Sequence, residues 1–278
     1  MDAHSMSRLP SISVSIRPSL LMRGYDLVGF AGAAGVQTVT LDLSSGLSKQ
    51  LAFRQAIPLV PTSAVWLGNP WLGLWNAAHH RERLGDLVKL LDPPAVAVDL
   101  DPANGSLIRP ATLIERVELT RRLVGRERSL LVTIRASQVL GGRRHLSDLT
   151  ALRHLAEEWD LGVALDLTGS LDATWEAEAA VFRLGNHLRL LRIPTTATDR
   201  LAVGQERVIA RALGAAMDQS VPPEVTLSPS VPLLWMMSDR ARAEATARSV
   251  MAIHSRVESV SSQRARFLNQ KLWPNLRG

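Results

Sequence analysis

Residues 39–43 read VTLDL, and close variants of this segment return as VAVDL at 96–100 and VALDL at 163–167. In each segment large aliphatic residues alternate with a small residue and then an aspartate, which is the period-two pattern of a β-strand. Longer segments with helical periodicity separate the three copies. Strands that alternate with helices in this way predict parallel strands joined by crossover helices.

The same alternation extends along most of the chain. Eight strand–helix units in this length predict an α/β protein that is a single (β/α)8 TIM barrel with a C-terminal helical extension; a doubly wound open sheet is the alternative. The eight predicted strands span 11–16, 38–42, 64–67, 95–99, 130–134, 162–166, 188–193 and 225–228. The clearest helical segments are 81–91, 110–124, 146–158, 173–184 and 201–217.

Two short motifs recur in the same order in the two halves of the chain. VSIRPS at 14–19 is similar to VTIRAS at 132–137, an offset of 118 residues, and the LDL of 41–43 returns at 165–167, an offset of 124. This order predicts a duplicated half-barrel. The alternative is chance similarity among short strands built from Val, Leu, Ile and Thr.

Length and composition narrow the class of protein. A chain of 278 residues fits one large domain, and we expect a flexible N-terminus at 1–10, the barrel at 11–255 and a basic helical extension at 256–278. The absence of cysteine excludes disulfides, a thiol nucleophile and cysteine-ligated metals. There is no apolar run of membrane-spanning length and no secretory signal pattern, so we expect a cytoplasmic protein with no membrane partner.

The positive charge is concentrated in the last 40 residues. Residues 239–278 hold eight basic and three acidic side chains, whereas the rest of the chain is almost neutral within a total of +6. Apolar residues in this segment follow a helical stripe. We expect this helix to pack on the barrel or on a second copy, which would make a homodimer; nucleic-acid binding through the basic helix is the less favoured alternative.

Strand parity predicts which side chains meet inside the barrel. The aliphatic residues of each strand should face the helices, and the small and charged ones should face inward. Charged residues then converge at the C-terminal ends of the strands, the barrel mouth, where barrel enzymes carry their chemistry. Residues of alternate strands share a layer, so acids and arginines are predicted in separate layers. The acids are Asp42, Asp99 and Asp166, and the arginines are Arg17, Arg135 and Arg192.

These charges have two interpretations. In one, the acids and guanidinium groups neutralise each other and close the barrel as a structural network. In the other, they form a polar pocket in which the arginines bind a phosphate or carboxylate and the aspartates transfer protons or hold a metal. Buried ion pairs are a poor source of stability, which slightly favours a site.

A metal site and a covering loop are further candidates. Asp99 and Asp101 lie on one face of a strand end, and with Asp166 they are candidate ligands for Mg²⁺ or Mn²⁺; a turn at 101–105 is the alternative. The tryptophans in and beside the segment 67–84 have two interpretations. They form an aromatic lid over a bound ligand, or they cover the hydrophobic core. The residues concerned are Trp66 and Trp71 as substrate contacts, Trp75 beside them, and His79 as an acid–base group next to His80.

The strand order, chain length and LDL or VDL strand ends over residues 11–255 resemble the xylose-isomerase-like barrels, the sugar-phosphate isomerase and epimerase group. The resemblance implies an isomerase, epimerase or lyase that binds a small anionic or sugar-like metabolite at the barrel mouth. Proteins of that group bind a divalent metal through Glu, Asp, His and Glu at the ends of strands five to eight. At the positions that match these metal ligands, this chain has Arg135, Asp166, Arg192 and Ser228, of which Asp166 alone fits. The alternative to an enzyme is a non-catalytic degenerate barrel that mediates protein interactions.

Overall fold

The computed structural model describes eight stretches of the chain, and these form one closed barrel of eight parallel strands in sequence order. The described residues are 11–16, 38–44, 61–68, 78–99, 110–135, 145–168, 177–195 and 205–229. The strands are β1 (Ile12–Ile16), β2 (Thr38–Asp42), β3 (Thr62–Gly68), β4 (Ala95–Val98), β5 (Ser129–Arg135), β6 (Gly162–Asp166), β7 (Leu188–Thr195) and β8 (Glu224–Pro229).

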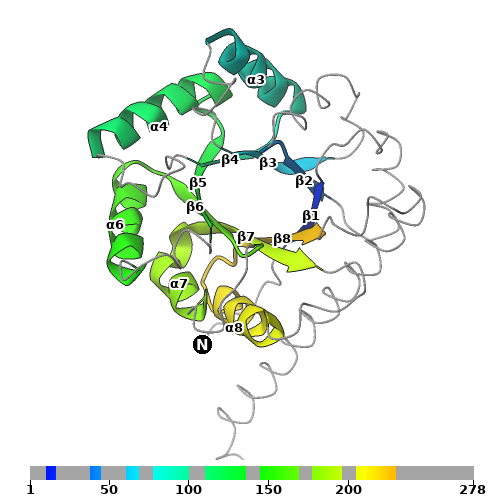
Figure 1. Cartoon of the computed structure of the whole chain (residues 1–278), viewed down its shortest axis with the longest axis vertical. Coiled ribbons are helices and arrows are strands. Elements are labelled where there is room, and N and C mark those ends of the chain that lie inside the picture. The colour runs from blue at the N-terminus through cyan, green and yellow to red at the C-terminus, as the bar shows by residue number, and fades with distance from the viewer. Residues whose placement is uncertain are drawn as a thin grey trace, which may run out of the picture.

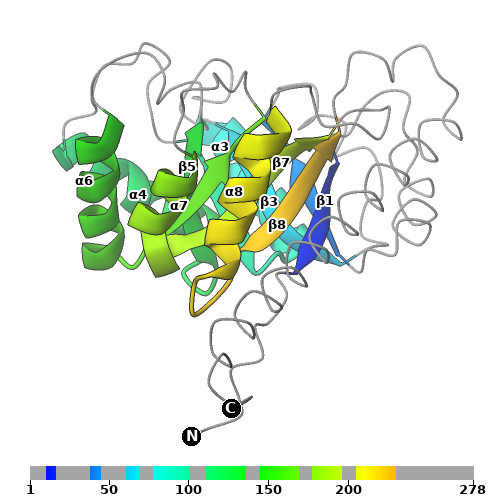
Figure 2. The same ribbon diagram turned by 90° about the horizontal axis from the view of Figure 1, so that it is seen from below.

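The described helices lie on the outside of the barrel, on the side formed by β3 to β8 (Figure 1), and run alongside the strands (Figure 2). None of the described helices is both long and apolar enough to cross a membrane. The helices are α3 (Ala78–Leu91), α4 (Pro110–Val124), α6 (His145–Glu158), α7 (Ala177–Leu184) and α8 (Gln205–Met217), with the short 3-10 helix η2 (Gly185–His187) after α7.

The predicted (β/α)8 barrel is confirmed. All eight predicted strands are present, and those at 38–42 and 162–166 have the predicted bounds. The open sheet is excluded because β1 pairs with both β2 and β8, which closes the ring. The predicted N-terminal segment 1–10 and the helical extension at 256–278 lie outside the described residues, so the domain division, the homodimer and the nucleic-acid alternative stay predictions.

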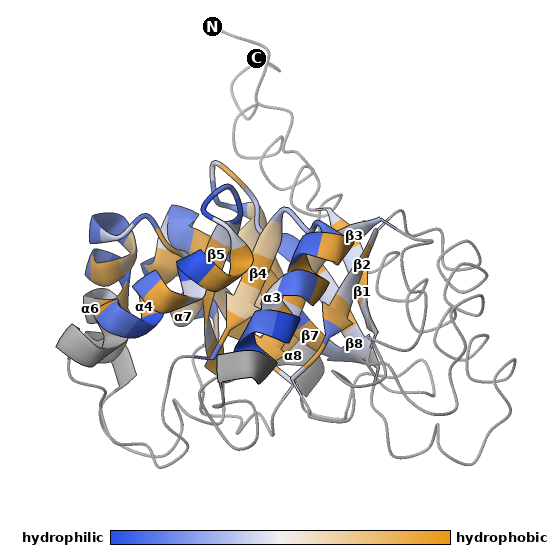
Figure 3. Cartoon of the chain, turned by 90° about the horizontal axis from the view of Figure 1, so that it is seen from above, coloured by the Kyte–Doolittle hydropathy of each residue, from blue (hydrophilic) through white to orange (hydrophobic). Residues whose placement is uncertain are grey.

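The two faces of the strands separate as parity predicts. The outer face carries large aliphatic residues such as Leu41, Val98 and Leu165, all fully buried in one cluster with the helices. Figure 3 shows this apolar layer in orange between the strands and the blue outer surface of the helices. A second, smaller cluster fills the barrel interior, and its members are Ala64, Trp66, Ala97, Leu131, Ala164 and Leu190.

The interior is apolar on one side and polar on the other. The apolar cluster comes from β3 to β7, whereas the neighbouring strands β8, β1 and β2 contribute the buried Thr226, Ser13 and Thr40. The Ser13 and Thr40 hydroxyls are 3.1 Å apart and hydrogen-bond each other. Trp66 is the largest of the fully buried side chains and lies directly below the charged end of the barrel.

Candidate functional site

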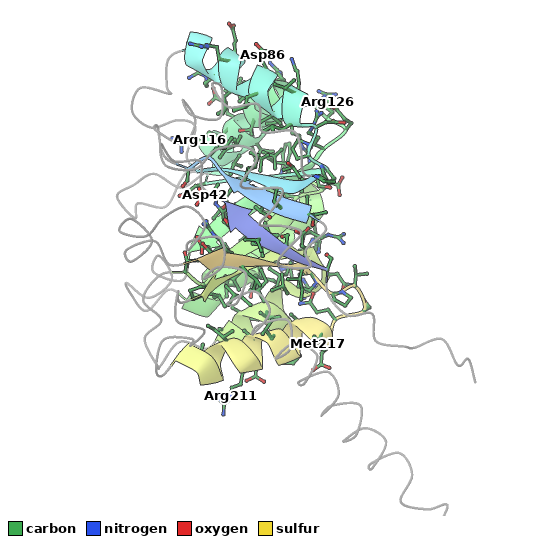
Figure 4. The ribbon with its side chains drawn as sticks, turned by 90° about the vertical axis from the view of Figure 1, so that its right-hand side faces the viewer. Asp42, Asp86, Arg116, Arg126, Arg211 and Met217 are labelled. Carbon is green, nitrogen blue, oxygen red and sulfur yellow. The ribbon has the colours of Figure 1, made fainter. Side chains whose placement is uncertain are left out.

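Three aspartates lie buried at the C-terminal ends of alternate strands. Asp42 ends β2, Asp166 ends β6, and Asp99 follows β4. Asp42 has no exposed surface, and the other two are 5% exposed. Figure 4 labels Asp42 at the end of the barrel toward which the strand arrows point. The three acids therefore gather at the barrel mouth, as the strand parity predicts.

Two of these aspartates make the same local turn. Asp42 Oδ1 accepts hydrogen bonds from the Ser44 backbone N–H at 3.0 Å and from the Ser44 hydroxyl at 2.5 Å. Asp166 Oδ1 accepts the equivalent bonds from Thr168, at 2.9 Å and 2.6 Å. Aspartate side chains form such turns with the backbone two residues further on. The turn fixes one carboxylate oxygen of each aspartate and leaves Oδ2 to meet other partners.

Arg192 joins the two aspartates across the barrel. Its Nη2 donates to Asp42 Oδ2 at 2.6 Å and to the Ser228 hydroxyl at 3.0 Å. Its Nη1 lies 3.7 Å from Asp166 Oδ2, within ion-pair range but beyond hydrogen-bond distance. Its Cζ lies 5.0 Å from the ring centroid of Trp66, in the range of a cation–π contact. One guanidinium thus contacts side chains from β2, β3, β6 and β8.

The strand register explains how these groups meet. Asp166 is aligned with Arg192 on the neighbouring β7, and Asp42 is aligned with Trp66 on the neighbouring β3. Trp66 and Arg192 therefore hold equivalent positions in the two halves of the barrel. Since β3 and β7 lie opposite each other in a ring of eight, a long side chain from one can stack on the other.

Gly68 allows the ends of β2 and β3 to approach closely. Its φ is +65°, and a Cβ there would lie 2.9 Å from the Cα of Ser44. A side chain at this position would push away the residue that hydrogen-bonds Asp42. The glycine therefore helps to place the Asp42 carboxylate.

The charges found here partly support the structural interpretation. Arg192 is 6% exposed and bonded to Asp42, so its predicted role in gripping a phosphate competes with that ion pair. Trp66 is 1% exposed with Arg192 over its ring, which favours the alternative that it covers the core. Arg192 also shows that acids and arginines are not confined to separate layers, because its side chain is long enough to leave its own layer.

One edge of the cluster leaves a carboxylate and a guanidinium beyond hydrogen-bond distance of each other. The 3.7 Å gap between Asp166 Oδ2 and Arg192 Nη1 allows a single oxygen to lie about 2.8 Å from both. A hydroxyl at that point would donate to the carboxylate and accept from the guanidinium. Arg192 Nε is also buried and has no hydrogen-bond partner among the described residues. This edge is suited to a hydroxyl or a carbonyl oxygen.

Several predicted site residues are only partly described. Arg135 ends β5, and His79 lies in the first turn of α3, but for both the backbone alone is described. Arg17, Trp71 and Asp101 lie outside the described residues. Their predicted roles stay predictions.

The donor set does not fit the metal site that the resemblance implies. In the part of the chain that the structure describes, no group of three or more His, Asp or Glu side chains is placed to hold a metal ion. Near the ends of β5 to β8, Asp166 is a good ligand, but β5 ends in Arg135 and β7 carries Arg192 beside Asp166. Arg192 puts a positive charge beside Asp166, where a ligand would be needed.

Ser44 and Thr168, which hydrogen-bond Asp42 and Asp166, are positions of the candidate site that the sequence interpretation missed. The sequence does contain a signal for them, because a serine or threonine follows two positions after the aspartate in both LDLS at 41–44 and LDLT at 165–168. Such spacing is typical of aspartate turns.

Comparisons with known proteins show the fold. No protein-family model and no curated protein matches the chain in sequence. A D-allulose 3-epimerase from a Methylomonas species, solved with D-allulose, is 12% identical over 89% of this chain and 97% of its own, with a TM-score of 0.61. A xylose isomerase domain containing protein from Salmonella typhimurium is also 12% identical, over 87% and 96%, with a TM-score of 0.59.

The same fold also occurs in a protein of another class. Endonuclease IV from Thermus thermophilus is 15% identical over 88% of this chain and 100% of its own, with a TM-score of 0.54. A shared fold does not determine the substrate, so function has to be argued from the site. The chain has the fold of the xylose-isomerase-like TIM barrels, as its strand order and strand ends predict.

Proposed function

We propose that this protein binds a small sugar-like metabolite at the barrel mouth and catalyses its isomerisation or epimerisation. The observation that carries the proposal is the edge formed by Asp166 Oδ2 and Arg192 Nη1, 3.7 Å apart and both nine-tenths buried. A carboxylate and a guanidinium side by side can recognise a hydroxyl or carbonyl oxygen. The likeness in fold to an epimerase solved with D-allulose supports this substrate class.

The charge of the described site favours a polyhydroxylated ligand over a strongly anionic one. Two buried carboxylates, Asp42 and Asp166, lie within ion-pair range of one buried guanidinium, and that guanidinium is already bonded to Asp42. A phosphate here would meet more negative than positive charge. If the metabolite is a sugar phosphate, its phosphate is expected at Arg17 or Arg135, at the ends of β1 and β5.

The proposed chemistry is proton transfer at the carbon next to a carbonyl. Asp166 takes that proton, the C–H electron pair forms a carbon–carbon double bond, and the carbonyl oxygen gains negative charge that Arg192 stabilises by hydrogen bonding. The hydroxyl on the deprotonated carbon gives its proton to the former carbonyl oxygen, and Asp166 returns its proton to the former carbonyl carbon, which moves the carbonyl by one position and gives an isomer. Delivery of a proton by Asp99 to the opposite face of the deprotonated carbon gives an epimer. Asp42 holds Arg192 in position, and His79 is a further acid–base candidate.

A non-catalytic barrel is the second candidate, and the Asp42–Arg192 pair favours it. The bond of 2.6 Å joins two side chains that are 0% and 7% exposed, as expected of a structural plug. Under this alternative the mouth binds no sugar, and Asp166→Asn changes only stability.

A thermal-shift screen with free and phosphorylated ketoses separates the two candidates. We expect at least one sugar to raise the melting temperature of the wild-type protein and of Asp86→Asn, but not of Asp166→Asn. Asp86 is a matched control because its carboxylate is exposed on α3 and lies 3.9 Å from Lys89. Deuterium incorporation from D₂O at the carbon next to the carbonyl then tests catalysis. If no sugar shifts the wild-type protein, or if it shifts Asp166→Asn equally, the proposal is wrong.

A further inference from the structure

The described mouth buries three carboxyl groups together with the guanidinium of Arg192. Asp42, Asp99 and Asp166 are each at most 5% exposed, and Arg192 is the buried basic residue among them. Ionised groups are costly to bury unless they are paired. The identity of the balancing cation is therefore a central property of this site.

Arg192 lies at the point where a bound cation would contact several strands. It is held by Asp42 across the barrel, and it also contacts Asp166 and Ser228 on its neighbours β6 and β8. Asp166 is the last residue of β6 and Ser228 is the last but one of β8, two of the strands from which the resemblance implies metal ligands. The Trp66 ring lies 5.0 Å from Arg192 Cζ. An indole face attracts a weakly hydrated guanidinium and offers no ligand atom to Mg²⁺ or Mn²⁺.

We propose that Arg192 is the permanent cation of this site and takes the place of the divalent metal that the resemblance implies. Asp42 is its positioning residue, since it accepts the 2.6 Å bond from Nη2. This inference stands on the charge and contacts of the mouth and does not depend on a sugar being the substrate. It explains why a guanidinium is built into the carboxylate cluster.

A fixed guanidinium and a metal ion have different properties that an experiment can separate. Arginine stays protonated throughout the working pH range and cannot be removed by a chelator. A metal bound through carboxylates stabilises only the loaded protein, in proportion to its concentration. Replacing Arg192 by a neutral side chain should turn the carboxylates into a binding site for an added cation.

The test is titration of the full-length protein with Mn²⁺ alone, followed by calorimetry and by thermal melting. Wild-type protein is expected to show no saturable Mn²⁺ binding and no change in melting temperature with EDTA. Arg192→Met is expected to melt lower, to bind about one Mn²⁺ per chain saturably over a concentration range in which the wild type shows no binding, and to regain stability with Mn²⁺. Arg192→Lys keeps the charge and is expected to remain insensitive to Mn²⁺.

Two further variants locate the effect. Arg189→Met removes an exposed arginine from the same strand β7 and is expected to behave as wild type. Asp166→Asn combined with Arg192→Met is expected to lose the acquired Mn²⁺ binding. If Arg192→Met does not fold alone, purification in Mn²⁺ is expected to recover it.

Three results would overturn the proposal. The first is saturable Mn²⁺ binding by the wild-type protein that Asp166→Asn abolishes, since the resident cation would then be a metal. The second is that the Arg192→Met variant folds but gains no affinity for Mn²⁺. The third is that the Arg192→Met variant does not fold alone and purification in Mn²⁺ does not yield folded protein.

Discussion

The ends of β2 and β6 have nearly the same sequence and the same turn, yet their aspartates have different surroundings. Asp42 Oδ2 is bonded to Arg192 at 2.6 Å, whereas Asp166 Oδ2 lies 3.7 Å from the same guanidinium. Asp42 is completely buried and Asp166 is 5% exposed. The comparison indicates that one aspartate anchors the arginine while the other keeps an oxygen beyond hydrogen-bond distance of it.

The difference arises from the residue aligned with each aspartate on the next strand. Asp166 stands beside Arg192 itself, so the long side chain extends past it toward the opposite wall. Asp42 stands beside Trp66, whose ring supports the guanidinium that arrives from β7. Two copies of one local motif thus acquire separate roles from their neighbours.

Asp42→Asn should have the largest effect on stability. The variant leaves Arg192 buried with its strongest partner neutralised, and loss of one member of a buried pair costs about 3 to 5 kcal/mol. Denaturant unfolding of wild type and variant measures this difference. A loss no greater than that of Asp166→Asn would remove the distinction between the two aspartates.

Asp166→Asn should cost less stability but remove ligand recognition. Its ion pair with Arg192 is longer and slightly exposed, so we expect a loss of about 1 to 2 kcal/mol. The same preparations, screened with ketoses, should show no sugar-dependent rise in melting temperature. A fully retained sugar response would assign the ligand to another part of the mouth.

The turn residues allow a finer comparison. Ser44→Ala should cost about 1 kcal/mol, because it removes a hydroxyl bonded to a fully buried carboxylate. Thr168→Ala should cost less, since Thr168 is exposed and water can replace its hydroxyl. Unfolding free energies of the two variants test this order, and equal losses would contradict it.

A surface ion pair gives the smallest expected effect and serves as the reference for the buried one. The hydrogen bond from Arg153 lowers the pKa of Glu157 on α6, and the charges of Arg153, His154 and His187 act in the same direction. A lowered folded-state pKa means that this carboxylate stabilises the protein above its unfolded pKa and ceases to do so as the pH falls through the folded value. Glu157→Gln should therefore lose slightly less stability than wild type on acidification, as melting temperatures across that range will show. An identical pH profile would mean that the pair contributes nothing measurable.

The fold could be predicted because each strand carries its own period-two signal. The alternation of Val39, Leu41 and Leu43 with Thr40 and Asp42 identifies both the strand and its inward face, and the closed barrel followed from the number of such units. The convergence of Asp42, Asp99 and Asp166 could be predicted for the same reason.

The pairing within the mouth could not be predicted in this way. Parity gives the direction of a side chain but not how far it reaches, so the bond from Arg192 on β7 to Asp42 on β2 has no counterpart in the local pattern. Parity also placed Trp66 inward without showing that Arg192 would cover it. Such contacts depend on how strands from opposite sides of the ring face each other.

The reach of Arg192 has a consequence for the history of the chain. If the barrel arose by doubling a half, the ancestral halves were alike, whereas the present ones are complementary: the first supplies an acid and an indole, and the second supplies the guanidinium that binds both. Two copies of the present first half would bring carboxylates and tryptophans together at the shared end without that guanidinium. In the present chain the two halves are therefore not interchangeable.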